Sequence, residues 1–320
     1  MRFLIAGVGA VGGFLAARLA DGGHEVTVLA RPHRAAELRK HGLRVTSATA
    51  DRTFWPGVVT APEVGPGYDA VLLAVKSEAL GAVMDDIAPA VTPSTAVVPF
   101  LNGLAHVERL AARFGPAVLG GVLRVVTQLG DDGAIKVLAP AFEAELGELD
   151  GAPGERAGRL AAAFRDAGAD VTVSADIVGA MWAKWVFIAS VGAVTSLMRA
   201  PAGDIVAVPG GERFARSVLA EAAATAAAAG HPVPGGRLRE AERSLTSPGS
   251  PATSSLSRDL VAGRPTEVEA VLGDLVERAR ATGVAVPLTE LATLALRVHN
   301  RRLAARDGSA AGPGRLVACW

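Results

Sequence analysis

The sequence has almost no cysteine and no excess of charge of either sign. Cys319 is the only cysteine among 320 residues, which excludes a disulfide framework and a thiolate metal site. Thirty-two Lys and Arg balance thirty-two Asp and Glu, which argues against a nucleic acid or an anionic membrane held by bulk charge. The six histidines lack the spacing of metal ligands, so no metal is expected. These features favour a protein of the reducing cytoplasm.

What the sequence has in abundance is apolar residues. They make up 50% of the chain, which excludes global disorder, and 320 residues are enough for two domains with a large buried core. The apolar start of the chain resembles a signal peptide, but glycines interrupt it in a pattern with another explanation. We therefore expect no targeting segment.

The start of the chain matches the pattern of a dinucleotide-binding βαβ unit. Short apolar runs at 2–6 and 24–30 predict two buried strands with a helix between them. In such a unit the glycines allow a tight turn, the approach of the pyrophosphate to the backbone, and close packing of the helix on the strand. The phosphates lie at the N-terminus of the helix. We therefore expect the cofactor to contact the loop formed by Gly7, Val8, Gly9, Ala10, Val11 and Gly12.

The residue that follows the second strand selects the cofactor. An NAD site would place Asp or Glu there for the ribose hydroxyls, whereas this chain has Arg31, with Arg34 nearby. A guanidinium suits the 2′-phosphate of NADP through a bidentate contact. The alternative is a pair of solvated loop arginines. The pattern favours NADP (NADPH).

The next strands place two more polar residues at the same edge of the expected sheet. Apolar runs at 68–75 and 95–101 predict buried strands, and Lys76 and Asn102 come directly after them. Ligands gather at the carboxyl ends of parallel strands, so both residues are candidates for cofactor contact and Asn102 also for substrate contact. Ordinary helix caps are the alternative.

Residues 117–147 have a different pattern. Short strand-like runs flank the turn Asp131-Asp132-Gly133, and we expect partly antiparallel strands that extend the sheet. A helix at 156–167 and a last strand at 170–173 follow. Strand signals stop there, which predicts a domain boundary near residue 175.

The stretch from Asp176 to Arg199 is the most unusual in the chain. Twenty-two residues separate these two charges, and only Lys184 among them is charged. A membrane span is disfavoured because the lysine and two glycines lie inside the run and the neighbouring helices are amphipathic. We therefore expect the buried central helix of a soluble domain. Burying a lysine costs several kcal/mol unless it is paired or neutral, which makes Lys184 a candidate catalytic group.

The rest of the second half predicts helices only. Thr266 and Glu269 have the spacing of a capping box, which would leave Glu267 as the carboxylate without a capping role at that helix start. A first-turn acid favoured by the helix dipole is the alternative for Glu267. The expected elements are helices at 211–229, 256–262, from 265 onward and at 288–301, a Ser/Pro/Gly loop at 245–255, and a tail at 307–320.

Taken together, these motifs resemble the ketopantoate reductase (2-dehydropantoate 2-reductase) family over residues 1–300. The resemblance implies an α/β fold with a Rossmann-type NADP-binding domain (1–175) and an all-α substrate and dimerisation domain (176–306). It also implies an NADPH-dependent oxidoreductase that converts a 2-oxo acid to a 2-hydroxy acid, as in pantothenate biosynthesis. The matching residues are Gly7, Gly9, Gly12, Arg31, Val75, Lys76, Asn102, Gly103, Trp182, Ala183, Lys184, Ser255, Thr266 and Glu267.

The resemblance also assigns roles. The family's catalytic lysine corresponds to Lys184 and its catalytic glutamate to Glu267, while Ser255 corresponds to the substrate serine. Hydride addition builds negative charge on the carbonyl oxygen, and a desolvated ammonium can stabilise that charge and supply the proton. The implied contacts of the cofactor are those already expected at Arg31, Lys76 and Asn102.

The chain departs from the family at its substrate-binding face. Members that reduce ketopantoate carry asparagines four and eight residues after the lysine, where this chain has Ile188 and Gly192, and Ala202 replaces a further asparagine. Apolar residues cannot hydrogen-bond a substrate hydroxyl or carboxylate. Either the substrate is less polar than ketopantoate, or other residues hold the acid; the candidates are Ser190, Thr195, Ser255 and Arg258.

Other functions remain open from the sequence. The lost asparagines are compatible with an NADP-binding regulator or partner protein without reductase activity, and sequence does not separate a 2-oxo acid reductase from a reductase of an unrelated ketone or imine. The expected partner is a small-molecule carbonyl compound, with no nucleic acid and no membrane. The apolar second half is compatible with a homodimer.

Overall fold

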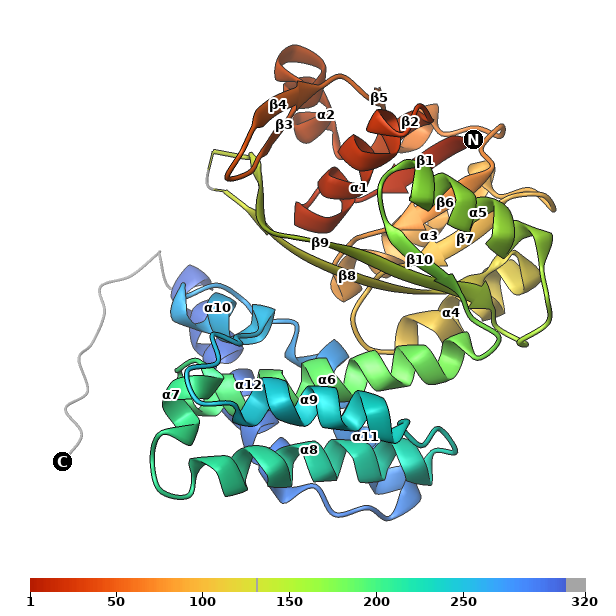
Figure 1. Cartoon of the computed structure of the whole chain (residues 1–320). Helices are drawn as coiled ribbons and strands as arrows, with labels where there is room; N and C mark the ends of the chain where they lie inside the picture. Colours follow the sequence, from red (N-terminus) through yellow and green to blue (C-terminus); the bar gives the residue numbers. More distant parts are fainter. Residues whose placement is uncertain (131, 309–320) are drawn as a thin grey trace. The chain divides into compact units, whose positions relative to one another are not determined.

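The computed structural model describes residues 1–130 and 132–308 (Figure 1). The described residues form two compact units, which divide between Met181 and Trp182. The boundary between the units lies within one long helix, α6 (Ile177–Met198), a little after the position expected near residue 175. Cys319, most of the expected tail, and Asp131 of the expected turn lie outside the described residues.

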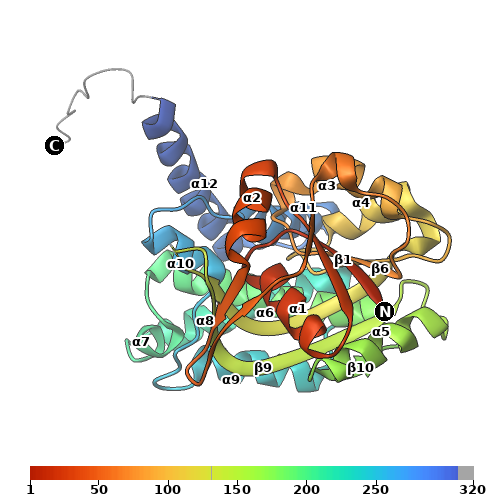
Figure 2. The ribbon, with the colours of Figure 1, turned by 90° about the horizontal axis from the view of Figure 1, so that it is seen from above.

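The first unit is built around a five-stranded parallel sheet in the order β5-β2-β1-β6-β7. β1 (Arg2–Ala6) pairs with β2 on one side and with β6 on the other; Figure 2 labels β1 and β6 next to each other. The chain thus first adds β2 and β5 on one side of β1, and later adds β6 and β7 on the other side. Ligands of open parallel sheets bind at such a switch point. The remaining strands are β2 (Glu25–Leu29), β5 (Gly57–Val59), β6 (Ala70–Leu73) and β7 (Ala96–Pro99).

Both faces of this sheet are buried, which explains why its strands read as continuous apolar runs. Alternate residues of β1 point to opposite faces: Phe3 and Ile5 belong to one hydrophobic core, Leu4 and Ala6 to the other. All four are fully buried. The helices of this unit are α1 (Ala10–Asp21), α2 (Pro32–His41), α3 (Leu80–Ile87), α4 (Ala105–Phe114) and α5 (Glu155–Asp166).

A second sheet accounts for the different pattern of residues 117–147. β8 (Leu119–Leu129) and β9 (Ile135–Glu148) form a long antiparallel pair, as expected. They do not extend the first sheet, however; β9 also pairs with β3 and β10 in the order β10-β9-β3-β4. An isolated bridge between Val97 and Val118 joins β7 to the start of β8. The other strands are β3 (Leu43–Thr46), β4 (Asp51–Phe54) and β10 (Asp170–Val173).

In the second unit all the regular elements among the described residues are helices. α6 has the bounds that the sequence predicts, because Asp176 accepts a hydrogen bond from the Gly179 N–H (2.9 Å) and Arg199 leaves the helix with φ 53°. α6 is long and apolar enough to cross a membrane, yet 67% of its most apolar stretch is buried inside the structure. It is therefore a core helix.

Helices α7, α9, α11 and α12 contact α8. Two of them, α7 and α9, were not predicted from the sequence, and α12 continues seven residues past its expected end at Arg301. The helices are α7 (Ala202–Val206), α8 (Gly211–Ala228), α9 (Gly235–Thr246), α10 (Ser255–Val261), a π-helical turn η5 (Glu269–Gly273), α11 (Asp274–Thr282) and α12 (Pro287–Gly308).

Candidate active site

The glycine loop lies at the switch point of the parallel sheet, between β1 and α1. Gly7 has φ 97°, and a Cβ there would lie 2.7 Å from the Ala74 carbonyl oxygen. A Cβ on Gly12 would collide with the Gly7 carbonyl oxygen, so both positions require glycine for packing. A Cβ on Gly9 would meet nothing within 4 Å. The space in front of Gly9 is thus open, as the approach of a ligand to the backbone requires.

The N-terminus of α1 begins at this open side of the loop. Its N-cap is Gly9, whose lack of a side chain means that no side-chain cap satisfies the first N–H groups. Free N–H groups and the helix dipole together favour an anion such as a phosphate. The loop therefore has the shape and the donors that a dinucleotide requires.

Three of the predicted cofactor contacts lie at the same edge of the sheet. Arg31 is the exposed N-cap of α2, Lys76 is exposed after β6, and Asn102 is partly buried after β7. Backbone hydrogen bonds hold these strand ends side by side, from Gly7 N to Leu29 O (3.5 Å), Ala74 N to Ala6 O (2.9 Å) and Phe100 N to Leu73 O (2.8 Å). The edge therefore presents two cations and an amide beside the glycine loop.

Arg34 differs from Arg31 in its surroundings. Its guanidinium donates to the Gly133 carbonyl (3.2 Å), in the turn between β8 and β9, and to the Glu37 carboxylate (3.1 Å). These contacts tie Arg34 to the second sheet. Of the two arginines, Arg31 is the one left exposed beside the loop.

In the second unit, Lys184 lies near the start of α6 and is partly buried. Trp182, Ala183 and Trp185 around it are buried, while Ile188, one turn along the same face, is partly buried like the lysine. The Lys184 ammonium is therefore carried by an apolar helix and has the apolar Ile188 one turn away.

Gly192 has a packing role in this structure. A Cβ there would lie 3.0 Å from a methyl group of Leu256 on α10 and 4.0 Å from Val271. At 100° per residue, Gly192 lies closer around the helix to Trp185 than to Lys184. The predicted place of Gly192 in a substrate site stays a prediction. Ala202, at the third altered position, is fully buried.

Glu267 comes directly before the helix that begins at Val268, and it is partly buried. Its carbonyl accepts the Val271 N–H (3.2 Å), so Glu267 closes the first turn of that helix. Lys184 and Glu267, the two predicted catalytic residues, both belong to the second unit.

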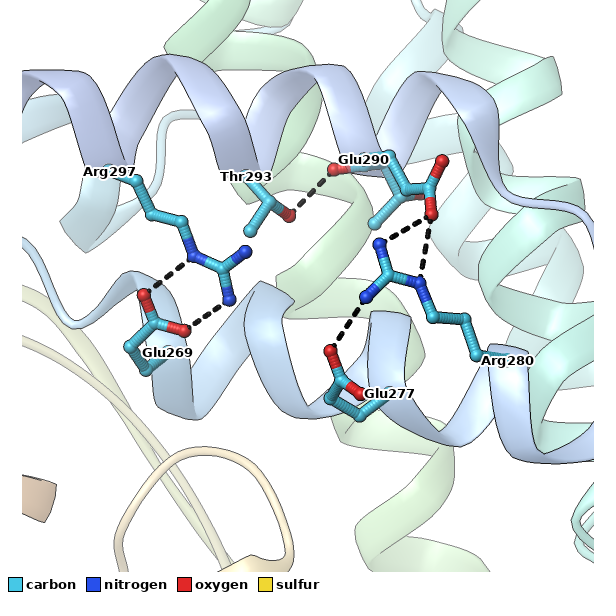
Figure 3. Close-up of polar contacts among 7 residues, drawn as sticks. Glu269, Glu277, Arg280, Glu290, Thr293 and Arg297 are labelled. Carbon is cyan, nitrogen blue, oxygen red and sulfur yellow. Dashed lines mark hydrogen bonds and ion pairs between the residues drawn. The ribbon is translucent and has the colours of Figure 1, made fainter.

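The predicted capping box between Thr266 and Glu269 is wrong. The N–H and hydroxyl of Thr266 donate to Asn300 Oδ1 on α12 (2.9 and 3.1 Å), and Asn300 Nδ2 donates back to the Thr266 carbonyl (2.8 Å). Glu269 instead pairs with Arg297 of α12 (Figure 3). Thr266 and Glu269 each bind a residue of α12, and the spacing of the sequence around them does not indicate these partners.

The four residues considered as contacts of a substrate carboxylate differ in exposure and in the hydrogen bonds they already make. Ser190 is fully buried and donates to the Val186 carbonyl (2.7 Å), and Thr195 donates to the Val191 carbonyl (2.6 Å). These hydroxyl protons are used within α6. Arg258 is exposed and donates to Thr253 (3.1 Å), and Ser255 is exposed as the first residue of α10.

Sequence reasoning missed an aromatic cluster formed by Trp182 and Trp185, which are close to Lys184 in the sequence of α6. The ring of Trp182 stacks on His231 (centroids 5.6 Å apart, 17° between planes), and the Arg278 guanidinium lies 5.7 Å from the Trp182 ring and 5.6 Å from the Trp185 ring. The Trp185 indole N–H donates to the Val271 carbonyl (2.8 Å). Two tryptophans flanking a lysine in a chain with 4% aromatics were the available signal.

A glycine loop at the switch point of a parallel sheet, followed by a helical unit with a single lysine in an apolar helix, defines a dinucleotide-binding oxidoreductase. Comparison with known families specifies the class. A family model described as ketopantoate reductase PanE/ApbA matches residues 3–151, and the model of its C-terminal domain matches residues 176–300.

Individual relatives agree with this match. The uncharacterized oxidoreductase YkpB of Bacillus subtilis is 34% identical over 291 residues, covering 91% of this chain and 96% of its own length. A 2-dehydropantoate 2-reductase of Halobacterium salinarum is 32% identical over 318 residues, covering 96% of this chain and 100% of its own. The crystal structure of a PanE/ApbA family ketopantoate reductase from Ralstonia eutropha has a TM-score of 0.84 at 28% identity, covering 95% of this chain and 100% of that one. The chain belongs to the ketopantoate reductase family and is an oxidoreductase, which confirms the expected family and fold.

Proposed function

We propose that this enzyme reduces a 2-oxo acid to a 2-hydroxy acid with NADPH, using Lys184 as the proton donor and Glu267 to orient it. The observation that carries the proposal is that Lys184 is the only charge inside α6 and shares a compact unit with Glu267. Relatives named 2-dehydropantoate 2-reductase, which match over most of this chain, support the same reaction. The reduction of ketopantoate to pantoate, a step of pantothenate biosynthesis, is the family reaction nearest to this one.

The residues at the edge of the parallel sheet suit NADPH. The open space at Gly9 and the N-terminus of α1 would hold the pyrophosphate, with Lys76 and Asn102 at the neighbouring strand ends. The exposed guanidinium of Arg31 would bind the 2′-phosphate. NADPH, when bound, supplies the hydride that forms the new C–H bond at the carbonyl carbon.

The protein supplies the proton and stabilises the charge. As the carbon receives the hydride, the electron pair of the C=O bond moves to the oxygen, and the Lys184 ammonium stabilises this negative charge. The ammonium then gives its proton to the oxygen, and the resulting amine regains a proton from solvent. Glu267 would hold the ammonium in place, and the exposed Ser255 is available to the substrate carboxylate.

The substrate that fits best lacks a hydroxyl group. Ile188 is apolar, and a side chain at position 192 would meet Leu256, so neither position offers a hydrogen bond to a polar substituent. A site without such partners leaves a substrate hydroxyl unsatisfied when water is excluded. We therefore propose a less polar 2-oxo acid than ketopantoate as the preferred substrate. The proposal also places the enzyme in the cytoplasm, which the single cysteine supports. It further includes a homodimer, which the apolar composition of the second half supports.

A matched pair of substrates tests this function. Ketopantoate and 3,3-dimethyl-2-oxobutanoate differ by one hydroxyl group, and NADPH oxidation followed by absorbance should give the higher kcat/KM with the second. Lys184→Ala should lose turnover by about 100-fold or more and still bind NADPH. A preference for ketopantoate would overturn the proposed polarity. Absence of turnover over a broad panel of ketones and 2-oxo acids would favour a binding protein without reductase activity.

A further inference from the structure

The helix that follows Glu267 begins with a π-helical turn. η5 covers Glu269–Gly273, and the Asp274 N–H bonds to the Glu269 carbonyl, five residues back, before regular α-helix resumes in α11. Such turns insert one residue into a helix and are frequent at functional sites. This one starts two residues after a predicted catalytic carboxylate.

One residue of this turn connects both predicted catalytic segments. The Val271 N–H donates to the Glu267 carbonyl (3.2 Å), and the Val271 carbonyl accepts the indole N–H of Trp185 (2.8 Å). Trp185 is the neighbour of Lys184 in α6. Two hydrogen bonds therefore connect the residue beside the lysine, through the backbone of Val271, to the backbone of the glutamate.

The connection is buried and closely packed. Trp185 is 1% exposed and Val271 is 2% exposed, so water does not replace the indole N–H when it is removed. At Gly192, two turns further along α6, an added Cβ would lie 4.0 Å from a methyl group of Val271, so this face of the helix lies close to the turn. Trp185 and Gly192 thus hold one face of α6 against the π-helical turn.

We propose that Trp185 is a positioning residue, whose hydrogen bond to Val271 sets the position of Lys184 relative to Glu267. The inference rests on the proposed function, since it assumes that these two residues act in the reaction. Without the indole donor the Val271 carbonyl loses its hydrogen bond to α6, and the turn can then shift away from that helix. The lysine and the glutamate then no longer share a fixed geometry, and positional errors near 1 Å can slow a reaction about 100-fold.

Replacing the indole N–H alone tests this role in the full-length protein. Trp185 is exchanged for 3-benzothienylalanine, an isosteric residue with sulfur in place of the N–H, and separately for phenylalanine in case one variant fails to fold. With NADPH and 3,3-dimethyl-2-oxobutanoate, we expect kcat per NADPH-binding site to fall about 10- to 100-fold in both. The dissociation constant of NADPH should stay within about twofold, because the predicted cofactor residues belong to the other unit.

The kinetic isotope effect separates positioning from general loosening. With NADPH deuterated at the transferred position, the isotope effect on kcat should rise in the Trp185 variants as the chemical step becomes rate-limiting. The matched control is Thr293→Val, which removes a buried hydroxyl donor to the Thr289 carbonyl (2.7 Å) on α12; kcat and its isotope effect should be unchanged there.

Two results have different meanings. If Lys184→Ala abolishes turnover while the isosteric Trp185 variant keeps the wild-type kcat, the positioning role is wrong and the proposed function stands. If Lys184→Ala keeps full turnover, the proposed function itself fails, and the role of Trp185 fails with it.

Discussion

Glu269 of the π-helical turn and Arg297 of α12 form a two-bond ion pair, with Arg297 Nε 2.8 Å from Oε1 and Nη2 2.6 Å from Oε2 (Figure 3). Hydrogen bonds from Arg297 lower the pKa of Glu269 below its ordinary value of 4.5, against the opposing effect of partial burial. The same bonds raise the pKa of Arg297. Gly273 makes room for the pair, because a Cβ there would collide with the Glu269 carboxylate. The ion pair therefore connects the π-helical turn η5 to α12.

Glu269→Gln should lower the free energy of unfolding by about 0.5–1 kcal/mol at pH 7, because both side chains are more than one third exposed and solvent screens the pair. A carboxyl whose pKa is lowered by folding stabilises the protein fully above its unfolded value of 4.5, and this stabilisation is lost as the pH falls through the lowered pKa. Urea unfolding should therefore show a difference between variant and wild type that shrinks below pH 4.5.

Glu277→Gln is the control for this pair, since Glu277 forms an exposed ion pair with Arg280 (2.9 Å) away from the turn (Figure 3). We expect a smaller change of about 0–0.5 kcal/mol there. Equal effects of the two substitutions at pH 7, or a Glu269→Gln difference that grows in acid, would show that the ion pair does not fasten the turn.

Two glycines of the loop should respond differently to alanine. Gly9 has φ −88°, which alanine adopts freely, and its Cβ would meet nothing, so Gly9→Ala should fold with a melting temperature equal to or slightly above that of the wild type. It should nevertheless weaken NADPH binding by at least about tenfold, because the methyl group stands where the pyrophosphate approaches. Gly12→Ala should instead destabilise the protein by about 1–3 kcal/mol through its collision with the Gly7 carbonyl. Calorimetry and fluorescence titration measure both; tight NADPH binding by Gly9→Ala would contradict the dinucleotide site.

Arg31 should decide between NADPH and NADH. Removing a bidentate charge-assisted contact loses about 1.5–3 kcal/mol, so Arg31→Ala should raise the dissociation constant of NADPH about 10- to 100-fold and leave that of NADH unchanged. Arg34→Ala is the matched control, because that guanidinium already binds Gly133 and Glu37. If Arg34→Ala instead lost NADPH affinity selectively, Arg34 and not Arg31 would be the residue that binds the 2′-phosphate.

Restoring the asparagines should separate substrate contact from packing. Ile188→Asn, at a partly buried position one turn from Lys184, should raise the kcat/KM ratio of ketopantoate to 3,3-dimethyl-2-oxobutanoate by about tenfold, because a buried amide can bind the hydroxyl group. Gly192→Asn should chiefly destabilise the protein by about 1–3 kcal/mol, since the new side chain meets Leu256. An unchanged ratio in Ile188→Asn would place the discriminating residue elsewhere.

Local signals predicted α6 and the glycine loop well. The run between Asp176 and Arg199 is continuous and ends at two charges, and a glycine motif between two strands constrains its own backbone. Long-range pairing was predicted less well. The strands β8 and β9 were expected in the first sheet because nothing in their own residues distinguishes one partner strand from another. The roles proposed for Lys184, Glu267, Arg31 and Ser255 stay predictions until the variants are measured.

The sequence by itself determined the order of the two folding patterns, the strand–loop–helix unit at the start, and the single charge in the apolar helix, because these depend on neighbours along the chain. Only the tertiary structure decided the partners of side chains far apart in sequence. Glu269 has the spacing of a cap but binds Arg297, and Trp185 donates to Val271, eighty-six residues away. A hydrogen-bonding group takes whichever partner packing brings within about 3 Å, and that partner is set by the fold rather than by sequence spacing.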